Sequence, residues 1–291
     1  LKINGWIVRR SVKKQLKKLG MTDDLIHMVA FNPLMGVVNG RKFSEKILVY
    51  HCYDEIGHSP WMKNHGAHYE KIFLERSDAV IVTSQGLYEK KKLGNPNCYL
   101  VRNGADTSLF STAFQNDPPQ QKTVGFIGSF DDRIDYEMLE YLAQSMPGTR
   151  FKFIGRVISE KKVKALEKYK NVDFTGPKIL QELPAYVKDF SVGIIPFVKN
   201  EFTKGIYPLK INEYLAAGIP VVATDFSYLD DFRDVISIAS NKDDFMKALE
   251  EEMNTDNVQK RMARREIARY NSWDQRAEEL SVVLESIENK K

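Results

Sequence analysis

Short apolar runs rich in β-branched residues alternate with helix-like segments along most of the chain. The clearest runs are AVIVTS at 79–84, FSVGIIPF at 190–197 and IPVVAT at 219–224. A strand that is apolar on both faces is typical of a parallel sheet covered by helices on both sides. Parallel neighbours also need a crossover between them, which is usually a helix. The pattern therefore predicts an α/β fold built from doubly wound parallel sheets.

The runs fall into two series. The first half suggests strands at 25–31, 46–53, 79–84 and 98–103, with helices in HYEKIFLERS and QGLYEKKKLG. The second half suggests strands in TVGFIGS, FKFIGRV, NVDFTG, FSVGIIPF, IPVVAT and VISIAS, with helices at 136–146, 160–169 and 179–188. Each series has the strand and helix alternation of one Rossmann-like domain.

A polar, proline-rich stretch, FQNDPPQQK at 114–122, lies between the two series and reads as a linker. At the other end, Ser272 and Gln275 form a capping-box pattern ahead of AEELSVVLESIE. We therefore expect an N-terminal domain over 1–115, a C-terminal domain over 116–270 and a closing helix over 271–291. The chain begins with a basic, helix-patterned segment and no opening strand, so we expect the N-terminal domain to be incomplete.

The N-terminal part is the basic one: residues 1–118 carry 17 Lys and Arg against 11 Asp and Glu. Its opening segment places basic side chains along a stripe at helical spacing. These are Arg9, Arg10, Lys13, Lys14, Lys17 and Lys18. A solvated face explains such a stripe, and contact with anionic lipid or an acidic acceptor is the alternative. The stripe has no interleaved aromatic residues, which disfavours nucleic acid.

No apolar run approaches the ~20 residues that span a bilayer, and no signal peptide is visible. We therefore expect a cytoplasmic protein, either free or at the inner face of the membrane. Cys52 and Cys98 each lie inside an apolar run, as buried free thiols do in a reducing compartment. The five histidines lack the spacing of a metal site.

The stretch YPLKINEYLAAGIPVVATD at 207–225 predicts a helix over 208–217 that feeds a buried strand. Pro208 suits the first helical position, and Gly218 suits the left-handed position after the last turn. Ligands of such sheets bind where loops lead into helix N-termini, and free N–H groups there attract phosphate. The loop with Thr203, Lys204 and Gly205 is therefore a candidate anion site.

Glu213 and Lys204 each have both a functional and a purely structural interpretation, and Gly128 has a functional one. Glu213 could accept hydrogen bonds from a cis-diol such as ribose, but a helix pair with Lys210 explains it equally well. Lys204 could meet a diphosphate as a point charge, although a solvated lysine is the simpler interpretation. Gly128, after the strand TVGFI, would let backbone approach a phosphate. The third glycine and the acidic residue of a nicotinamide dinucleotide site are absent, whereas a mononucleotide diphosphate is compatible.

Taken together, these stretches resemble the retaining glycosyltransferases of the GT-B fold, in family 4, and within it the teichuronic-acid and capsule-type sugar transferases. The residues that carry the resemblance are LVYHCYDE, ERSDAVIVTSQGLYEKK, YLVRNGADTSLF, VGFIGSFDDRIDYEMLEYLA, VGIIPF, EFTKG, YPLKINEYLAAGIPVVATD and NSWDQRAEEL. Their order and spacing agree over nearly the whole chain from about residue 25.

The resemblance implies two Rossmann-like domains facing a cleft, and transfer of a sugar from a nucleotide diphosphate sugar to a glycan or lipid-linked hydroxyl, with retention and without a metal. It assigns Glu213 to the ribose hydroxyls and Lys204, with Arg133, to the diphosphate. The other donor-binding positions that it implies are Gly128, Ser129, Gly176, Leu180, Pro208, Leu209 and Lys210. His51 and Asp54, at the end of an N-terminal strand, would approach the donor sugar.

The sequence departs from the family pattern at Gly205, which stands where the family commonly has a first glutamate, eight residues before Glu213. Two other functions therefore stay open beside the transferase. The first is a nucleotide-sugar-binding module without turnover. The second is another enzyme of the same fold, a nucleotide-sugar epimerase.

Overall fold

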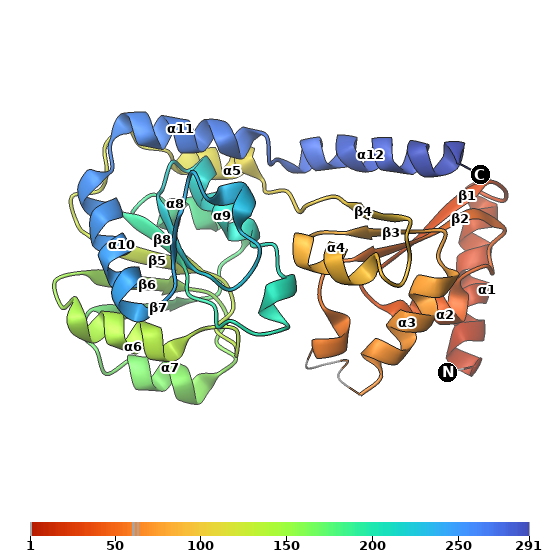
Figure 1. Cartoon of the computed structure of the whole chain (residues 1–291), viewed down its shortest axis with the longest axis horizontal. Helices are drawn as coiled ribbons and strands as arrows, with labels where there is room; N and C mark the ends of the chain where they lie inside the picture. The colour runs from red at the N-terminus through yellow and green to blue at the C-terminus, as the bar shows by residue number, and fades with distance from the viewer. Residues whose placement is uncertain (1, 60–61, 63, 291) are drawn as a thin grey trace. The chain divides into compact units, whose positions relative to one another are not determined.

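The computed structural model describes residues 2–59, 62 and 64–290, and the chain folds into two compact units (Figure 1). The first unit contains the residues up to Arg102, the short segment Lys204–Tyr207 and the residues from Ala277 onward. The second unit contains Asn103–Thr203 and Pro208–Arg276. The first crossing of the chain between units thus falls at Arg102, ahead of the predicted boundary at residue 115.

The first unit is built on a four-stranded parallel sheet with the order β1-β2-β3-β4. The four predicted strands are confirmed, each with a shorter carboxyl end than the sequence suggested. Their bounds are β1 (Leu25–Ala30), β2 (Glu45–Cys52), β3 (Ala79–Val82) and β4 (Cys98–Leu100).

Alternate residues of the central strands enter two separate cores. Leu48 and Tyr50 of β2 pack with Phe73 and Leu87 in one cluster, which lies on the side of α3 and α4. Ile47, Val49 and Ile81 pack on the opposite face with Ile287 and neighbouring apolar residues of α12, which runs along the sheet (Figure 1). This period of two explains why β2 and β3 are apolar throughout.

The helices of the first unit are α1 (Lys2–Lys18), α2 (Pro33–Asn39), α3 (Gly66–Arg76) and α4 (Gln85–Lys91), with the 3-10 turn η1 (Ile56–His58) and most of α12 (Trp273–Asn289). The sequence interpretation missed α2. Its signals are present, because Asn32 accepts a hydrogen bond from the Leu34 amide at 3.1 Å and Pro33 opens the helix. The expected cap of α12 is confirmed, since Ser272 Oγ accepts from the Gln275 amide at 3.3 Å.

The second unit is built on a six-stranded parallel sheet with the order β10-β9-β8-β5-β6-β7. The central pair is β8 beside β5, where the chain reverses its direction of winding. All six predicted strands are confirmed. Their bounds are β5 (Thr123–Ile127), β6 (Arg150–Ile154), β7 (Val172–Gly176), β8 (Val192–Ile195), β9 (Val221–Thr224) and β10 (Ser237–Ala239).

Helices pack around this sheet: α10 contacts β8, β9 and β10, and α9 contacts α5 and α11 (Figure 1). The α-helices are α5 (Thr107–Phe110), α6 (Tyr136–Ser145), α7 (Glu160–Leu166), α8 (Leu183–Val187), α9 (Leu209–Ala216), α10 (Lys242–Thr255) and α11 (Val258–Arg269). The 3-10 turns are η2 (Ser111–Ala113), η3 (Leu180–Glu182), η4 (Thr203–Gly205) and η5 (Asp230–Phe232).

Two local predictions need correction. The single helix expected over 179–188 is the 3-10 turn η3 followed by the short helix α8, with Pro184 in the first turn of α8. The polar stretch at 114–122 is not the crossing between units, because all of it lies in the second unit. It is held there in part by buried Arg261, whose Nε donates to the Gln115 carbonyl at 2.8 Å.

In the part of the chain that the structure describes, no helix combines the length and apolarity needed to cross a membrane.

Candidate functional site

The carboxyl ends of β5 and β6 meet backbone to backbone in the second unit. Gly128 and Gly155 follow these strands with φ of +146° and +152°, which only glycine adopts readily. The Gly128 amide donates to the Ile154 carbonyl at 2.8 Å, and a Cβ at Gly155 would collide with the Gly128 carbonyl. Gly128 is partly exposed and has no side chain, so its backbone can approach a phosphate.

The Lys210 side chain lies over Gly128. A Cβ built on Gly128 would stand 2.5 Å from Lys210 Cε and 3.2 Å from Nζ. Nζ also lies 5.8 Å from the ring centroid of Phe126. Burial lowers the pKa of Lys210 and the charge of Arg133 adds to this, while Glu213 and Asp131 act in the opposite direction. Lys210 is thus a partly buried cation that forms no ion pair among the described residues, held where an anion would stabilise it.

Lys210 belongs to α9, which begins later than predicted. Pro208 is the N-cap, with φ −81° and ψ 102°, and Leu209 is the first helical residue. No side chain of the described residues caps this end of the helix. The C-terminal prediction is confirmed, because Gly218 follows the helix with φ +76°. The N–H groups of the first turn therefore carry the positive end of the helix dipole without a side-chain acceptor.

A buried tyrosine ties α9 to β5. The Tyr214 hydroxyl accepts a hydrogen bond from the Ile127 amide at 2.9 Å, and the side chain is fully buried. Its ring also lies against Gly193 of β8, where a Cβ would stand 2.5 Å from the ring. These contacts set the position of α9 against the end of β5, and so place Lys210 over Gly128.

Glu213 lies one helical turn after Lys210. Burial raises the pKa of its carboxyl, and the charge of Lys210 only partly opposes this effect. No ion pair joins the two side chains among the described residues, so the structure does not show the close helix pair that the sequence allowed. A carboxyl in this environment favours hydrogen-bond donors such as sugar hydroxyl groups.

Arg133 is already engaged. Its Nε and Nη2 donate to the Asp131 carboxylate at 2.9 and 2.6 Å, and its guanidinium carbon lies 5.6 Å from the centroid of Phe197. Two further donor-binding predictions lie at nearby strand ends of the same sheet. Partly exposed Ser129 follows Gly128, and Gly176, with φ +77°, ends β7 and accepts from the Gly155 amide at 3.0 Å. The predicted Leu180 lies in η3 and is 43% exposed.

The remaining predicted residues belong to the first unit. His51 is the last residue but one of β2 and packs edge-on against Tyr53, with ring centroids 4.6 Å apart. Burial lowers the pKa of His51 to about 4, so its imidazole is neutral at physiological pH. Asp54 lies in the turn that follows, where its carbonyl accepts from Cys52 Sγ at 3.3 Å. Lys204 lies in the segment Lys204–Tyr207, which packs with this unit, whereas Gly128, Lys210 and Glu213 are in the other.

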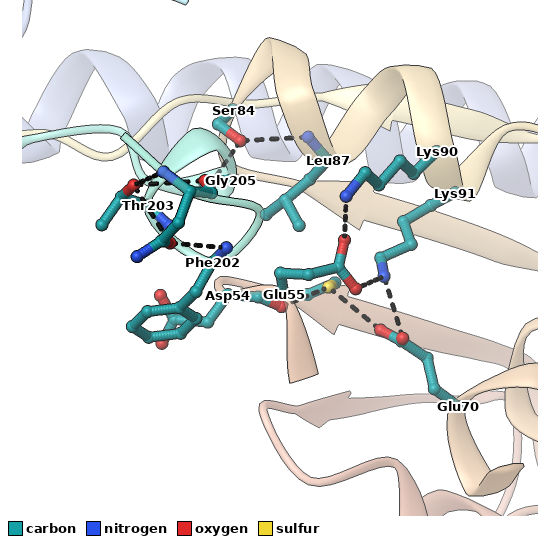
Figure 2. Close-up of polar contacts among 12 residues, drawn as sticks. Asp54, Glu55, Glu70, Ser84, Leu87, Lys90, Lys91, Phe202, Thr203 and Gly205 are labelled. Carbon is teal, nitrogen blue, oxygen red and sulfur yellow. Dashed lines mark hydrogen bonds and ion pairs between the residues drawn. The ribbon is translucent and has the colours of Figure 1, made fainter. Parts of the chain in front are cut away.

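Gly205 has a packing reason to be glycine. A Cβ at this position would stand 3.3 Å from Cβ of Glu55 and 3.5 Å from Cδ2 of Leu87, which is tighter than ordinary contact for the first of these. Its carbonyl accepts a hydrogen bond from Ser84 Oγ at 2.7 Å (Figure 2). The neighbours of Gly205 therefore leave little room for a side chain at the position where the family resemblance implies a glutamate.

Two residues of this arrangement were not singled out from the sequence. Gly155 could have been found from the sequence, because the tripeptide Phe-Ile-Gly closes both β5 and β6 at 126–128 and 153–155. Tyr214 had none, since a tyrosine in an apolar helix is most simply a core residue. Both cysteines are free and buried, as expected. Within the described residues, no three His, Cys, Asp or Glu side chains are grouped so as to hold a metal ion.

Comparison with known proteins finds a family match within the second unit. Residues 121–254 match the family model "Glycosyl transferases group 1". The chain is also 29% identical over 229 residues to TuaH of Bacillus subtilis (strain 168), a protein named for a glycosyltransferase of teichuronic acid biosynthesis. That match covers 70% of this chain and 56% of TuaH, so the chain spans only about half the length of this relative.

Solved structures share the fold at low sequence identity. Sucrose-phosphate synthase from Thermosynechococcus elongatus superposes with a TM-score of 0.77 at 18% identity, over 98% of this chain and 78% of that one. Staphylococcus aureus TarM, solved in complex with fondaparinux, α-GlcNAc-glycerol and UDP, gives a TM-score of 0.69 at 17% identity, over 93% and 57% of the two chains. Anabaena HepE, in complex with UDP and glucose, gives 0.69 at 15% identity, over 89% and 77%. The predicted GT-B class of α/β fold is confirmed.

Proposed function

We propose that the chain is part of a retaining glycosyltransferase that moves a sugar from a nucleotide diphosphate sugar to a hydroxyl group during synthesis of a cell-surface glycan. The observation that carries this proposal is the convergence of three features in the second unit. They are the partly exposed backbone at Gly128, the partly buried ammonium of Lys210 beside it and the start of α9, which has no side-chain cap. All three lie within the stretch that matches the group 1 family model.

The reaction needs stabilisation of the departing diphosphate. The bond between the anomeric carbon and the diphosphate oxygen breaks, the acceptor oxygen bonds to the anomeric carbon, and the acceptor proton passes to the leaving phosphate. Negative charge grows on the phosphate as the bond breaks, so fixed positive groups lower the barrier. Lys210 and the N–H groups at the start of α9 supply such charge without reorganisation, so a metal ion is not required for this role.

Glu213 would hold the ribose of the donor. Its raised pKa reflects an environment poor in solvent, where two sugar hydroxyls could donate to the carboxyl. Arg133 is a weaker candidate for the phosphate than the sequence suggested, because Asp131 already accepts two of its hydrogen bonds. Lys204, His51 and Asp54 keep the roles that the family resemblance implies, in contact with the diphosphate and the donor sugar.

Calorimetric titration with UDP, GDP and dTDP, each free and as a hexose conjugate, tests the donor class. We expect one nucleoside diphosphate to bind and its sugar conjugate to release diphosphate when a polyol acceptor is present. Binding without release would instead favour the non-catalytic module. That alternative is supported by Gly205, which stands where the family resemblance implies a glutamate. Conversion of the bound sugar without transfer would identify an epimerase, and no binding at all would exclude a nucleotide-sugar site.

We also propose that α1 contacts an anionic membrane surface on the cytoplasmic side. The helix contains no acidic residue, and Arg10, Lys13, Lys14, Lys17 and Lys18 are exposed. Arg9 differs, because its Nη1 donates to the Val38 carbonyl at 3.2 Å and faces the protein. Trp6 and Ile7 are 55% and 53% exposed beside these cations. Such a surface fits the headgroup region of a bilayer.

Sedimentation with vesicles tests this contact. The wild-type chain should sediment with phosphatidylglycerol vesicles and remain in solution with phosphatidylcholine vesicles. Replacing Lys13, Lys14 and Lys17 by Gln should abolish sedimentation, because each cation near the surface contributes about 1 kcal/mol. Equal sedimentation of the wild type and the triple variant would exclude the basic stripe as the contact.

A further inference from the structure

The Ser84 hydroxyl makes two hydrogen bonds, one within its own helix and one to a distant segment. As the N-cap of α4, its Oγ accepts from the Leu87 amide at 3.2 Å. The same hydroxyl donates to the Gly205 carbonyl at 2.7 Å (Figure 2). The side chain is 3% exposed, so neither bond competes with bulk water. A capping serine needs only the first bond, and the second reaches a segment far away in sequence.

The segment that receives this bond is short and lies between two chain crossings. Lys204–Tyr207 packs with the first unit, while Thr203 before it and Pro208 after it pack with the second. Thr203 is held on its own side, since its Oγ1 donates to the Val198 carbonyl at 2.6 Å. A glycine within so short a segment has wide conformational freedom unless it is held in place. The bond from Ser84 fixes the peptide group next to Lys204.

Glu55 packs against Gly205 from another side. Its Cβ and amide nitrogen lie 3.3 and 3.6 Å from the position of a Cβ on Gly205. Glu55 itself is held by lysines of α4, with Oε1 2.8 Å from Lys91 Nζ and Oε2 3.4 Å from Lys90 Nζ (Figure 2). Lys91 also pairs with Glu70 at 2.8 Å. The surface that meets Gly205 is therefore rigid and buried.

We propose that Ser84 is a positioning residue that fixes the Lys204–Tyr207 backbone, and through it Lys204, for binding of the nucleotide diphosphate. The inference rests on the proposed function, because Lys204 contacts a diphosphate only if a nucleotide sugar is the donor. Ser84 itself touches no substrate in this scheme. Its hydroxyl limits the conformations of Lys204 in the free protein. Less of the binding free energy is then needed to order Lys204 when the nucleotide binds.

Ser84→Gly is the most selective variant. Glycine is a fair N-cap and costs only a few tenths of a kcal/mol relative to serine, so α4 should remain folded while the bond to Gly205 is lost. Asn32→Gly is the matched control. It removes the capping side chain of α2 in the same unit, where Asn32 Oδ1 accepts from the Leu34 amide at 3.1 Å. A general loss of stability would affect both variants alike.

The first measurement is calorimetric affinity for whichever of UDP, GDP and dTDP binds the wild-type chain best. Loss of one buried hydrogen bond predicts about a three- to tenfold weaker affinity for Ser84→Gly and no change for Asn32→Gly. Lys204→Ala should weaken binding by itself. In the Lys204→Ala background, Ser84→Gly should then have almost no further effect, because Ser84 acts through Lys204.

The second measurement needs no ligand. Amide hydrogen exchange at Gly205–Tyr207 should become about three- to tenfold faster in Ser84→Gly and stay unchanged in Asn32→Gly. Unchanged exchange, or an affinity loss of the same size with and without Lys204, would overturn the positioning role and leave the proposed function intact. Failure of the wild type to bind any of the three nucleotides would overturn the proposed function, and the role of Ser84 in binding with it.

Discussion

The ammonium group of Lys210 lies directly over the backbone of Gly128, so close that a single methyl group on Gly128 would stand 2.5 Å from Lys210 Cε. Gly128 lies in the turn after the central strand β5, and Lys210 is the second residue of α9. Together they combine an accessible backbone with a cation of reduced hydration. The contact makes the site sensitive to changes that would be harmless in an ordinary turn.

Gly128→Ala should weaken both the fold and nucleotide binding. The left-handed conformation costs a non-glycine residue about 1–2 kcal/mol, and the methyl group must also displace Lys210. Urea unfolding and calorimetric titration with the nucleotide measure the two effects. Gly148→Ala is the control, because nothing lies within 4 Å of a Cβ at that position. Equal behaviour of the two variants would contradict the close approach of Lys210.

Binding of a nucleoside diphosphate should take up protons through Lys210. Burial lowers the pKa of Lys210 below its usual 10.5, and a neighbouring phosphate raises it again. The affinity should therefore fall as the pH rises through the pKa of the bound complex. Titrations at a series of pH values below the usual 10.5, in two buffers of different ionisation enthalpy, measure this uptake. Lys210→Met should bind the nucleotide more weakly and without proton uptake. Proton uptake that persists in the variant would assign the proton to another group.

Glu213 should make the fold less stable as the pH rises above the acid range. Burial raises the pKa of its carboxyl above the usual 4.5. The raised pKa contributes stability below the unfolded value, and this contribution is lost as the pH rises through the folded value. The free energy of unfolding of the wild type should therefore fall relative to that of Glu213→Gln between about pH 4 and pH 7. Urea unfolding over this range measures the difference, with Glu251→Gln as an exposed control. Parallel pH curves for the wild type and Glu213→Gln would show that the carboxyl is ionised normally.

Tyr214→Phe should destabilise the second unit by about 1–3 kcal/mol, because it leaves the buried Ile127 amide without its acceptor. The same change should also lower nucleotide affinity, since the bond sets the position of α9. Tyr270→Phe alters a side chain that is 68% exposed and should cost almost nothing. Thermal unfolding of both variants is the measurement. A wild-type melting temperature for Tyr214→Phe would mean that water or another group replaces the hydroxyl.

Lys91→Met should destabilise the first unit by about 3–5 kcal/mol, because it leaves the buried carboxylates of Glu55 and Glu70 without this ion-pair partner. Burial opposes the charge on Lys91, but Cys52, Glu70 and Glu55 together raise its pKa above the usual range. Lys92→Met is the control, since the Lys92 side chain is 38% exposed and pairs with Glu89 on the surface. Denaturant unfolding compares the two. A similar small effect of both changes would show that the buried ion pairs of Lys91 contribute little to stability.

Much of the fold follows from local signals. The strands, most helices, the left-handed Gly218 and the Ser272 cap depend on runs of a few residues whose hydrophobic period or conformational preference is visible in the chain. The errors occur where two local signals compete. Pro208 could open a helix or cap it, and the polar stretch at 114–122 could link domains or simply cross the surface of one.

The sequence by itself determined two parallel α/β sheets and a helix start of the kind that binds anions, because apolar periodicity and capping are properties of neighbouring residues. Only the tertiary structure decided which side chains meet. Lys210 reaches Gly128 because Tyr214 ties α9 to the end of β5, and Ser84 meets Gly205 because a four-residue segment packs with the other unit. Such contacts join residues far apart in the chain, and they depend on strand order and packing, which no local pattern records.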